Sequence, residues 1–542
     1  MIITEDFKKV IKCDAIDNRT NTLHIWKNDE VNVVILEQII RSGEWSKLEY
    51  IDGFFAAVYN TPDKVYLFCD RLGIYPLFYC TKENAVYASP RIPDILGETQ
   101  SSLNHSFEGI LSLLIFGHHI ADETIFTDIK RCNGGETIII NKDGKIEKKI
   151  EWRKKYIYQD KTSINPDDLC ELFIENVRKM IPADGQILLS LSGGFDSRAV
   201  LAALLECLES NRIQTITFGG KGTYDFRIAK LVANKAGVKN LTFPITEKVF
   251  RDSFLRQRAG DYSFSYPVFS TQPQEMLNYF SEELSKGNTS FWGVGGDAIT
   301  GSHLRPSDIS LQTCKNSEEL ARLLIAKRCY LPLTVVSNIT KLDENEIVEI
   351  IGHLIDRAHQ SQYDKLWQFL DSWDIFVRGR MEIIAILPFY LQLWRCPHLG
   401  RDYFREMSTQ CFENKIGQNA YKRMISSRFK FLFSLPTRRL RGRALVDGKV
   451  RSLCWVTQWR IAKLKKSMAK IAGLNIDGVG RNYGRELKFL NSTEGQKSLY
   501  HVMETLLRKK ILRADSNNIL HVAQKNNRIS RIFFTLAYGL DK

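Results

Sequence analysis

The chain has 542 residues, of which 44% are hydrophobic and 25% are charged, and its net charge is +14. This length predicts three or four globular domains. No apolar stretch approaches a membrane span, Met1–Asp14 lacks the order of a signal peptide, and the eleven scattered cysteines contain no Cys-x-x-Cys pair. These features exclude a disulfide framework and a zinc site and favour a cytoplasmic protein.

The first readable pattern is a pair of strands, Ile51–Tyr59 and Lys64–Cys69, on either side of a turn that contains proline. The run Asp70–Tyr79 follows directly, and Thr124–Phe126 and Gly134–Thr137 stand further along the chain.

Residues 187–208 predict a buried strand, a glycine-rich loop and a helix. The loop is Ser192-Gly193-Gly194-Phe195-Asp196-Ser197, and its glycines would let the backbone close on a phosphate at the start of the helix. The Asp196 carboxylate would repel that phosphate unless a divalent cation lay between them, so the loop predicts ATP with Mg²⁺. No Gly-Lys-Ser/Thr follows, so this is not a Walker loop. Our predicted nucleotide-binding residues here are Leu191, Ser192, Gly193, Gly194, Asp196 and Ser197.

Two further segments continue the pattern. Ile213–Phe218 predicts the next strand, Gly219–Asp225 a loop and Phe226–Ala236 a helix. Alternating strands and helices predict a parallel, doubly wound sheet with ligands at the carboxyl ends of the strands. Phe291–Gly301 contains a third glycine-rich loop, for which a simple tight turn is the alternative.

The loop at 192–197 resembles the pyrophosphatase (PP) loop of enzymes that cleave ATP between the α and β phosphates. These include asparagine synthetases, tRNA-modifying ligases and sulfur transferases. The run from Asp52 to Ala56, together with Asp70–Tyr79 and Thr124–Phe126, resembles the glutaminase domain of the asparagine synthetase family, in the same order. The resemblance covers about residues 31–440 of the 542.

The resemblance implies an α/β fold in three parts. Residues 1–150 would form a truncated glutamine-amidotransferase-like αββα sandwich of the N-terminal nucleophile (Ntn) type. Residues 160–440 would form a parallel, doubly wound ATP-pyrophosphatase domain, and residues 441–542 a basic, mostly helical region.

Glutaminases of this family begin at a cysteine exposed after Met1 is removed, whereas position 2 here is Ile2. The family's glutamine-holding stretches have no counterpart in Met1–Tyr50, and Cys13 is internal. We therefore expect no glutamine hydrolysis and a scaffold role for this segment, unless the true start of the chain lies upstream.

For the synthetase half, the resemblance implies that the backbone around Phe218 and Gly219 holds adenine and that Asp225 matches the family's aspartate after this strand. It implies that Gly293, Gly295 and Gly296 close over pyrophosphate, and that Asp297 shares Mg²⁺ with Asp196. Val294 and Ala298 replace two family glutamates, the first of which helps to position the aspartyl substrate and ammonia. These replacements are compatible with adenylation and argue against asparagine as the product.

Arg378–Glu382 and Leu387–Phe389 resemble the family's "R … P-F-L-D" region. The family places a lysine nearby to stabilise the acyl-phosphate transition state, and Lys422 and Arg423 are the nearest matches. The alternative for each is a solvated helix cation.

Residues 441–542 hold 21 Lys and Arg against 7 Asp and Glu. Within 452–472, Ile461, Leu464, Met468 and Ile471 recur at helical spacing, and a basic face lies opposite them. Such a helix packs on its own domain or lies on an anionic membrane surface. It lacks the arginine and aromatic pattern of RNA-binding segments, so nucleic acid is not favoured. We predict a cytoplasmic protein, with peripheral contact at the inner membrane face as the alternative.

The leading hypothesis is an ATP-dependent carbon–nitrogen ligase. It would activate a small-molecule, peptide or glycan carboxylate as an acyl-adenylate and transfer it to ammonia or another amine. A non-catalytic ATP-binding scaffold, a lasso-peptide or lactam-type cyclase and a tRNA-modifying enzyme remain open. The sequence predicts no oligomeric state.

Overall fold

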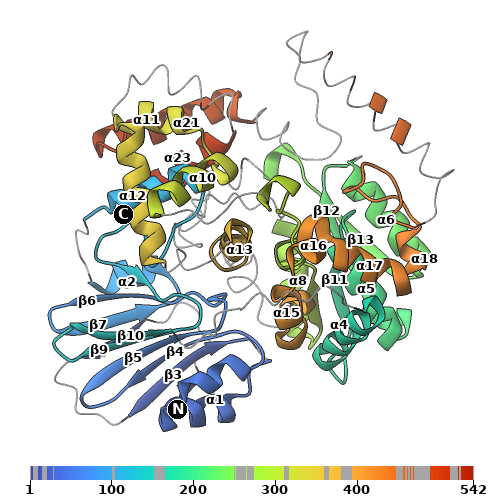
Figure 1. Cartoon of the computed structure of the whole chain (residues 1–542), viewed down its shortest axis with the longest axis horizontal. Helices are drawn as coiled ribbons and strands as arrows, with labels where there is room; N and C mark the ends of the chain where they lie inside the picture. Colours follow the sequence, from blue (N-terminus) through green and yellow to red (C-terminus); the bar gives the residue numbers. More distant parts are fainter. Residues whose placement is uncertain are drawn as a thin grey trace.

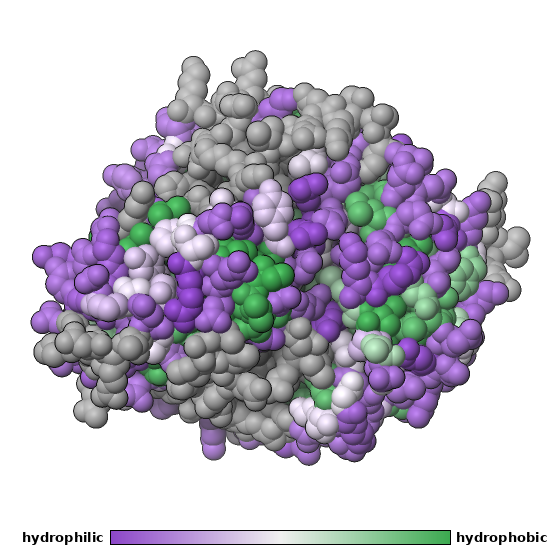
Figure 2. All heavy atoms as spheres, turned by 90° about the horizontal axis from the view of Figure 1, so that it is seen from below, coloured by the Kyte–Doolittle hydropathy of each residue, from purple (hydrophilic) through white to green (hydrophobic). Residues whose placement is uncertain are grey.

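The computed structural model describes residues 2–3, 10–14, 21–28, 30–99, 104–151, 165–221, 223–249, 251, 264, 274–309, 316–358, 365–379, 394–446, 456–457, 460–461, 464, 468, 489–512, 523 and 527–540. Three sheets and the helices around them form an α/β fold, which confirms the predicted class (Figure 1). Within these ranges, no helix has both the length and the apolar character needed to cross a membrane. The face seen in Figure 2 is mainly hydrophilic, with separate apolar patches.

The N-terminal part holds a six-stranded sheet, ordered β1-β3-β4-β5-β9-β10, and a four-stranded sheet, ordered β2-β7-β6-β8. The strands are β1 Ile2–Ile3, β2 Ile11–Asp14, β3 Thr22–Lys27, β4 Phe55–Asn60, β5 Lys64–Cys69, β6 Phe78–Lys82, β7 Ala85–Ser89, β8 Lys130–Arg131, β9 Glu136–Asn141 and β10 Ile146–Glu151. The helices are α1 Val33–Ser42, α2 Ile92–Thr99 and α3 Phe107–Phe116, with the short helical turn η1 Trp45–Tyr50.

Alternation along the strands builds four layers from these elements. On β4, Ala56 and Val58 enter the core cluster between the two sheets, whereas Phe55 and Ala57 belong to the cluster beneath α1. β7 alternates in the same way, between the intersheet core and the core beneath α2 and α3. Successive side chains of a strand point to opposite faces, so the result is the predicted αββα sandwich.

A five-stranded sheet, ordered β13-β12-β11-β14-β15, forms the centre of the second part, and all its neighbouring strands are parallel. Its strands are β11 Ile187–Ser190, β12 Ile213–Gly219, β13 Lys239–Pro244, β14 Thr289–Trp292 and β15 Trp394–Arg395. The chain runs outward from β11 to β13 and then returns to β14 on the other side of β11. The carboxyl ends of β11 and β14 are therefore a topological switch point, where such sheets bind ligands.

Helices α4 Pro166–Met180, α5 Asp196–Cys207, α6 Tyr224–Ala236, α8 Gln274–Ser285 and α9 Gly296–Ile299 belong to this part. So do α15 Arg401–Ser408, α16 Phe412–Lys415, α17 Asn419–Arg428 and α18 Lys430–Phe433 (Figure 1). The short helical turns are η2 Ser210–Arg212, η4 Pro306–Asp308, η6 Pro397–Leu399 and η7 Ile416–Gln418.

A helical cluster completes the molecule. It contains α10 Ser317–Arg328, α11 Leu333–Thr340, α12 Glu344–Arg357, α21 Thr493–Arg508 and α23 Asn527–Leu540. Their apolar faces share one core cluster with α3, so the C-terminal helices pack against the N-terminal part (Figure 1). Between the parts, α13 Leu366–Ser372 continues as the π-helical segment η5, Trp373–Arg378.

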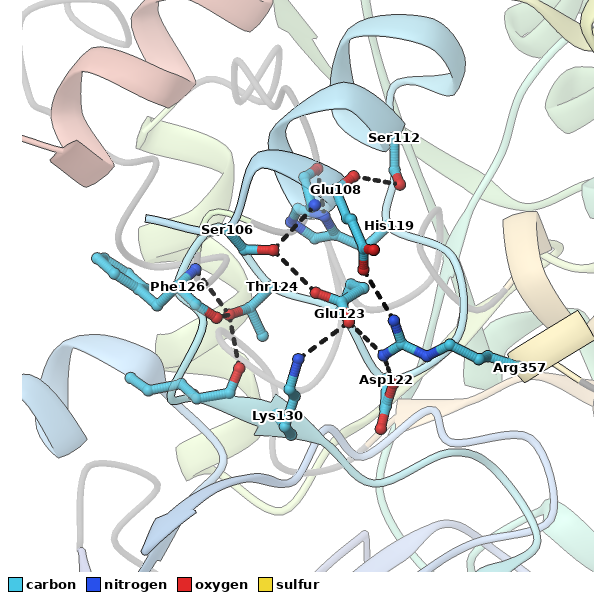
Figure 3. Close-up of polar contacts among 12 residues, drawn as sticks. Ser106, Glu108, Ser112, His119, Asp122, Glu123, Thr124, Phe126, Lys130 and Arg357 are labelled. Carbon is cyan, nitrogen blue, oxygen red and sulfur yellow. Dashed lines mark hydrogen bonds and ion pairs between the residues drawn. The ribbon is translucent and has the colours of Figure 1, made fainter. Parts of the chain in front are cut away.

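A charged network joins the helical cluster to the N-terminal part (Figure 3). Arg357 of α12 forms ion pairs with Glu108, at 2.8 Å, with Asp122, at 2.8 Å, and with Glu123. Glu123 is almost fully buried and also pairs with Lys130 at 2.9 Å. Burial alone would raise the pKa of Glu123, but the two cations outweigh it and lower that pKa.

Candidate active site

Hydrogen bonds among its own residues shape the loop after β11. The Ser197 hydroxyl accepts the Ser192 N–H at 3.0 Å and lies 3.1 Å from the Ser192 hydroxyl, which accepts the Gly194 N–H at 3.2 Å. The buried Leu191 donates its N–H to a carbonyl of β12 at 2.8 Å. Helix α5 begins at Asp196. The unpaired N–H groups of its first turn therefore lie at this loop, which suits an anion.

The loop after β14 packs directly on the start of α5. A Cβ atom on Gly293 would lie 2.4 Å from the backbone nitrogen of Ser197, and one on Gly296 would lie 2.8 Å from Cγ of Asp196. Both positions therefore require glycine. Asp297 follows Gly296 in the first turn of α9. The structure thus brings the two aspartates together, about 100 positions apart in the chain.

The electrostatics at this meeting point favour a cation. Burial and the adjacent Asp297 carboxylate raise the pKa of Asp196, and the Tyr421 hydroxyl donates a hydrogen bond to the Asp196 carboxylate. Oδ1 of Asp196 is buried and has no hydrogen-bond partner among the described residues. A buried carboxylate oxygen without a partner, next to a second carboxylate, costs free energy unless a positive charge joins it.

The donor set fits Mg²⁺, which prefers oxygen ligands and binds one or two carboxylates together with phosphates and water. Across the described ranges, no group of three or more His, Cys, Asp or Glu side chains is placed to hold a metal ion. A cation at Asp196 and Asp297 would take its other ligands from phosphate and water.

Asp225 connects the loop to the adjacent strand. Its Oδ1 accepts the N–H of Gly193 at 3.1 Å, and the Nε of Arg438 lies 3.1 Å from the same oxygen. Phe218 and Gly219 end β12, which pairs with β11, so they lie at the same edge of the sheet as the loop. Phe218 is half-buried and Gly219 is buried.

Two arginines that sequence reasoning missed also lie here. Arg438 donates its backbone N–H to the Gly193 carbonyl at 2.9 Å, besides its contact with Asp225. Arg439 is exposed, and its charge acts to lower the pKa of both Asp196 and Lys422. The sequence signal that could have located them is the pair of adjacent arginines itself, which lies outside any helix that the sequence predicts.

Arg198 holds the segment that carries these arginines. It is fully buried, and its guanidinium donates to the carbonyls of Leu432 and Leu435, both at 3.2 Å, and of Pro436 at 2.8 Å. Because Arg198 comes directly after the loop, one side chain links α5 to the approach of Arg438.

Helix α17 carries both Lys422 and Arg423, and of the two it is Lys422 whose pKa responds to the charge of Arg439. Lys422 is half-buried, and burial together with the charge of Arg439 lowers its pKa. Arg423 is exposed and donates to the Asn414 side chain at 2.8 Å.

The turn after β15 lies under the loop that carries Asp297. A Cβ atom on Gly295 would lie 2.6 Å from Cδ2 of Leu399, and one on Gly296 would lie 2.9 Å from Cδ2 of His398. The Nε2 atom of His398 lies 3.0 Å from the Tyr421 hydroxyl. Burial lowers the pKa of His398 to about 3, so this imidazole is neutral at pH 7.

Comparison with known families agrees with this arrangement. A family model described as asparagine synthase matches residues 168–523, which is more than half of the chain. The chain belongs to the asparagine synthase family. A second family model, described as a glutamine amidotransferase domain, matches residues 18–152.

Similarity to individual relatives is lower. The asparagine synthetase of Mesocricetus auratus is 26% identical over 335 residues, which cover 55% of this chain and 54% of the relative. Asparagine synthetase 2 of Bacillus subtilis is 25% identical over 224 residues, which cover 38% and 29%. The chain spans about half the length, or less, of the curated relatives it matches.

Two solved structures are also similar. The allosteric regulatory enzyme of purine biosynthesis has a TM-score of 0.18 and 13% identity, with 43% of this chain and 62% of that chain covered. The glutamine-dependent NAD+ synthetase of Acinetobacter baumannii, bound to ADP, has a TM-score of 0.18 and 16% identity, with 50% and 66% covered.

Two details of the asparagine synthase pattern can now be placed. The run Arg395-Cys396-Pro397-His398-Leu399 brings His398 and Leu399 against the loop that carries Asp297. Most of Arg378–Glu382 and Leu387–Phe389, the segments that resemble the family's "R … P-F-L-D" region, falls in 380–393, outside the described residues. At the positions of the two family glutamates, Val294 packs against the first core cluster and Ala298 is buried.

Proposed function

We propose that this chain is an ATP-dependent, AMP- and pyrophosphate-forming amide ligase. It would activate a carboxylate as an acyl-adenylate and transfer the acyl group to ammonia or another amine. The observation that carries the proposal is the meeting of Asp196 and Asp297 between two glycine loops at the switch point of the parallel sheet. Membership of the asparagine synthase family supports it.

In the first step, a substrate carboxylate oxygen attacks the α-phosphorus of ATP. The bond from that phosphorus to the oxygen bridging to the β-phosphate breaks, and pyrophosphate leaves. The N–H groups and hydroxyls of Ser192–Ser197 orient the phosphates, while Lys422, Arg438 and Arg439 offset negative charge on them. Mg²⁺ held by Asp196 and Asp297 would neutralise further triphosphate charge.

In the second step, the amine nitrogen attacks the acyl carbon. The bond from that carbon to the AMP oxygen breaks, the amine loses one proton, and the amide and AMP form. Val294 and Ala298 provide no carboxylate to receive an ammonium group or the proton. We therefore propose that the product is an amide other than asparagine.

We further propose that the N-terminal part does not hydrolyse glutamine. Its cysteines are Cys13, Cys69, Cys80 and Cys132, and all four are buried. Burial raises the pKa of Cys80 to about 12 and the pKa of Cys132 well above its ordinary value. A cysteine nucleophile needs an accessible thiol that loses its proton readily.

The test is Mg²⁺-dependent ATP binding by calorimetry, followed by exchange of labelled pyrophosphate into ATP across a panel of small-molecule, peptide and glycan acids. We expect Asp196→Asn and Asp297→Asn to weaken binding of Mg²⁺ with ATP at least about 10-fold, because a metal ligand is lost. With the correct acid, both variants should lose pyrophosphate exchange.

Asp63→Asn, which changes an exposed carboxylate in the β4–β5 turn, is the matched control and should behave as wild type. Exchange that persists in Asp196→Asn would overturn the site. Binding of ATP without exchange on any acid would instead favour a non-catalytic nucleotide-binding protein, which the apolar Val294 and Ala298 motivate.

A further inference from the structure

Two motifs of the N-terminal part have no role in the chemistry proposed above, and both lie where this part meets the parallel sheet. Phe54, from the first motif, stacks on Trp394 of the edge strand β15, with ring centroids 5.2 Å apart and planes 6° apart. The guanidinium of Arg71, from the second motif, lies 5.8 Å from the centroid of the Phe54 ring.

Arg71 bridges the two parts of the molecule. It is 3% exposed, and its guanidinium donates to the Ile51 carbonyl at 3.2 Å and to the Leu399 carbonyl at 2.6 Å. The preceding Asp70 fixes the backbone here, since its carboxylate accepts three N–H groups of the following loop at 2.9 to 3.2 Å. The planar fork of arginine reaches two carbonyls at once, which a lysine ammonium at the same position cannot reproduce.

Leu399 is also the residue that supports the loop carrying Asp297. Its side chain lies against Gly295, whose φ of +82° and lack of a Cβ atom permit the contact. The neighbouring His398 lies against Gly296. A shift of the turn at Leu399 would therefore move the backbone that carries Asp297, because the turn and the loop are packed too closely for one to move without the other.

We propose that Arg71 is a positioning residue for the Asp297 loop, so that the N-terminal part completes the ATP site instead of supplying ammonia from glutamine. The path runs from Arg71 to the Leu399 carbonyl, and through the Leu399 side chain to Gly295 and Asp297. The proposal rests on the proposed ATP site.

The experiment compares Arg71→Met, which removes both donated hydrogen bonds, with Arg71→Lys, which can keep one. Hydrogen exchange measured by mass spectrometry reports on the segment Gly293–Ile299, and calorimetry gives the dissociation constant for ATP with Mg²⁺. In Arg71→Met we expect amide exchange in this segment to speed up at least about fivefold and ATP binding to weaken about 10-fold. Arg71→Lys should lie between Arg71→Met and wild type.

Arg357→Met is the matched control, because Arg357 joins the N-terminal part to α12 through the network of Figure 3, where its ion-pair partners are Glu108, Asp122 and Glu123. It should lower the melting temperature without changing exchange in Gly293–Ile299 or ATP binding. If Arg71→Met does not fold, Leu399→Ala keeps the carbonyl that Arg71 binds, removes the side chain against Gly295, and should shift both readouts in the same direction.

Unchanged exchange and unchanged ATP affinity in a folded Arg71→Met or Leu399→Ala would overturn the proposal. So would equal effects of Arg71→Met and Arg357→Met, because a general loss of docking would then explain both. Failure of the wild type to bind ATP with Mg²⁺ would instead overturn the proposed function, and the exchange of Gly293–Ile299 would still report on Arg71.

Discussion

Arg198 is a fully buried cation that has three backbone carbonyls as partners. Burial lowers its pKa to about 9, because removing a guanidinium from water disfavours its charged form. The hydrogen bonds to these carbonyls compensate for burial, and they fix the segment that leads to Arg438 and Arg439. Arg198, one position beyond the Ser192–Ser197 loop, thus helps to place the charge of Arg438, which lies 240 positions further along the chain.

We expect Arg198→Met to lower the free energy of unfolding by at least about 3 kcal/mol, because three buried hydrogen bonds from a charged donor are lost. ATP binding should weaken as well, since Arg438 loses its anchor. Urea denaturation and calorimetry measure the two effects. Arg212→Met is the control: Arg212 also donates to backbone carbonyls, but from a partly exposed position. Equal destabilisation by the two variants would contradict this role of Arg198.

At the scale of elements, the π-helical segment η5 concentrates charge between the parts of the molecule. Its Asp374 lies 2.8 Å from Arg328 and 2.5 Å from Arg378, and 3.8 Å from His303. Burial alone would raise the pKa of Asp374, but electrostatic interactions with His303, Arg378 and Arg328 outweigh burial and hold that pKa at about 2. The neighbouring Asp371 faces the same His303 at 3.0 Å and pairs with the buried Lys415.

This depressed pKa predicts how stability depends on pH. An aspartate with a pKa of about 2 when folded, and about 3.9 when unfolded, stabilises the fold above pH 4 and loses that contribution as the pH falls to about 2. Over this interval we expect the free energy of unfolding of the wild type to fall about 2 kcal/mol further than that of Asp374→Asn. Urea denaturation at a series of pH values measures it, and parallel curves would contradict it.

At the scale of the whole molecule, positive charge and exposed apolar side chains coincide in one segment. Residues 448–476 contain seven Lys and Arg and no Asp or Glu. Ile461, Leu464 and Met468, at helical spacing, are exposed by 49%, 62% and 61%. Much of the remaining basic face predicted there lies outside the described residues. Apolar side chains on one face and lysines on the other are typical of helices that lie on anionic membranes.

We therefore expect the protein to sediment with vesicles that contain anionic lipid and to be released by salt, because screening weakens the attraction. Leu464→Glu combined with Met468→Glu should abolish sedimentation. Vesicles of zwitterionic lipid and an Ala462→Ser variant are the controls. Equal sedimentation with both kinds of vesicle would count against a membrane role for the segment.

The sequence could locate β11, the Ser192–Ser197 loop and α5, because strand, turn and helix signals follow one another within about 20 residues. Helix α5 begins at Asp196, inside the loop predicted at 192–197, since Asp196 suits its first turn. Arg438 and Arg439 could not be found in this way, because only tertiary packing brings them to the loop. Lys422 and Arg423 are adjacent in sequence, yet neighbours on a helix face different directions, and only the fold shows that Lys422 lies near Arg439 while Arg423 bonds to Asn414.

The first core cluster runs from β2, through the parallel sheet, to Leu435. A fragment containing either half alone would expose an apolar wall to water and would tend to aggregate. Selection on either half therefore also preserves the other. Because the two halves share one hydrophobic core, we expect them to be inherited as one unit.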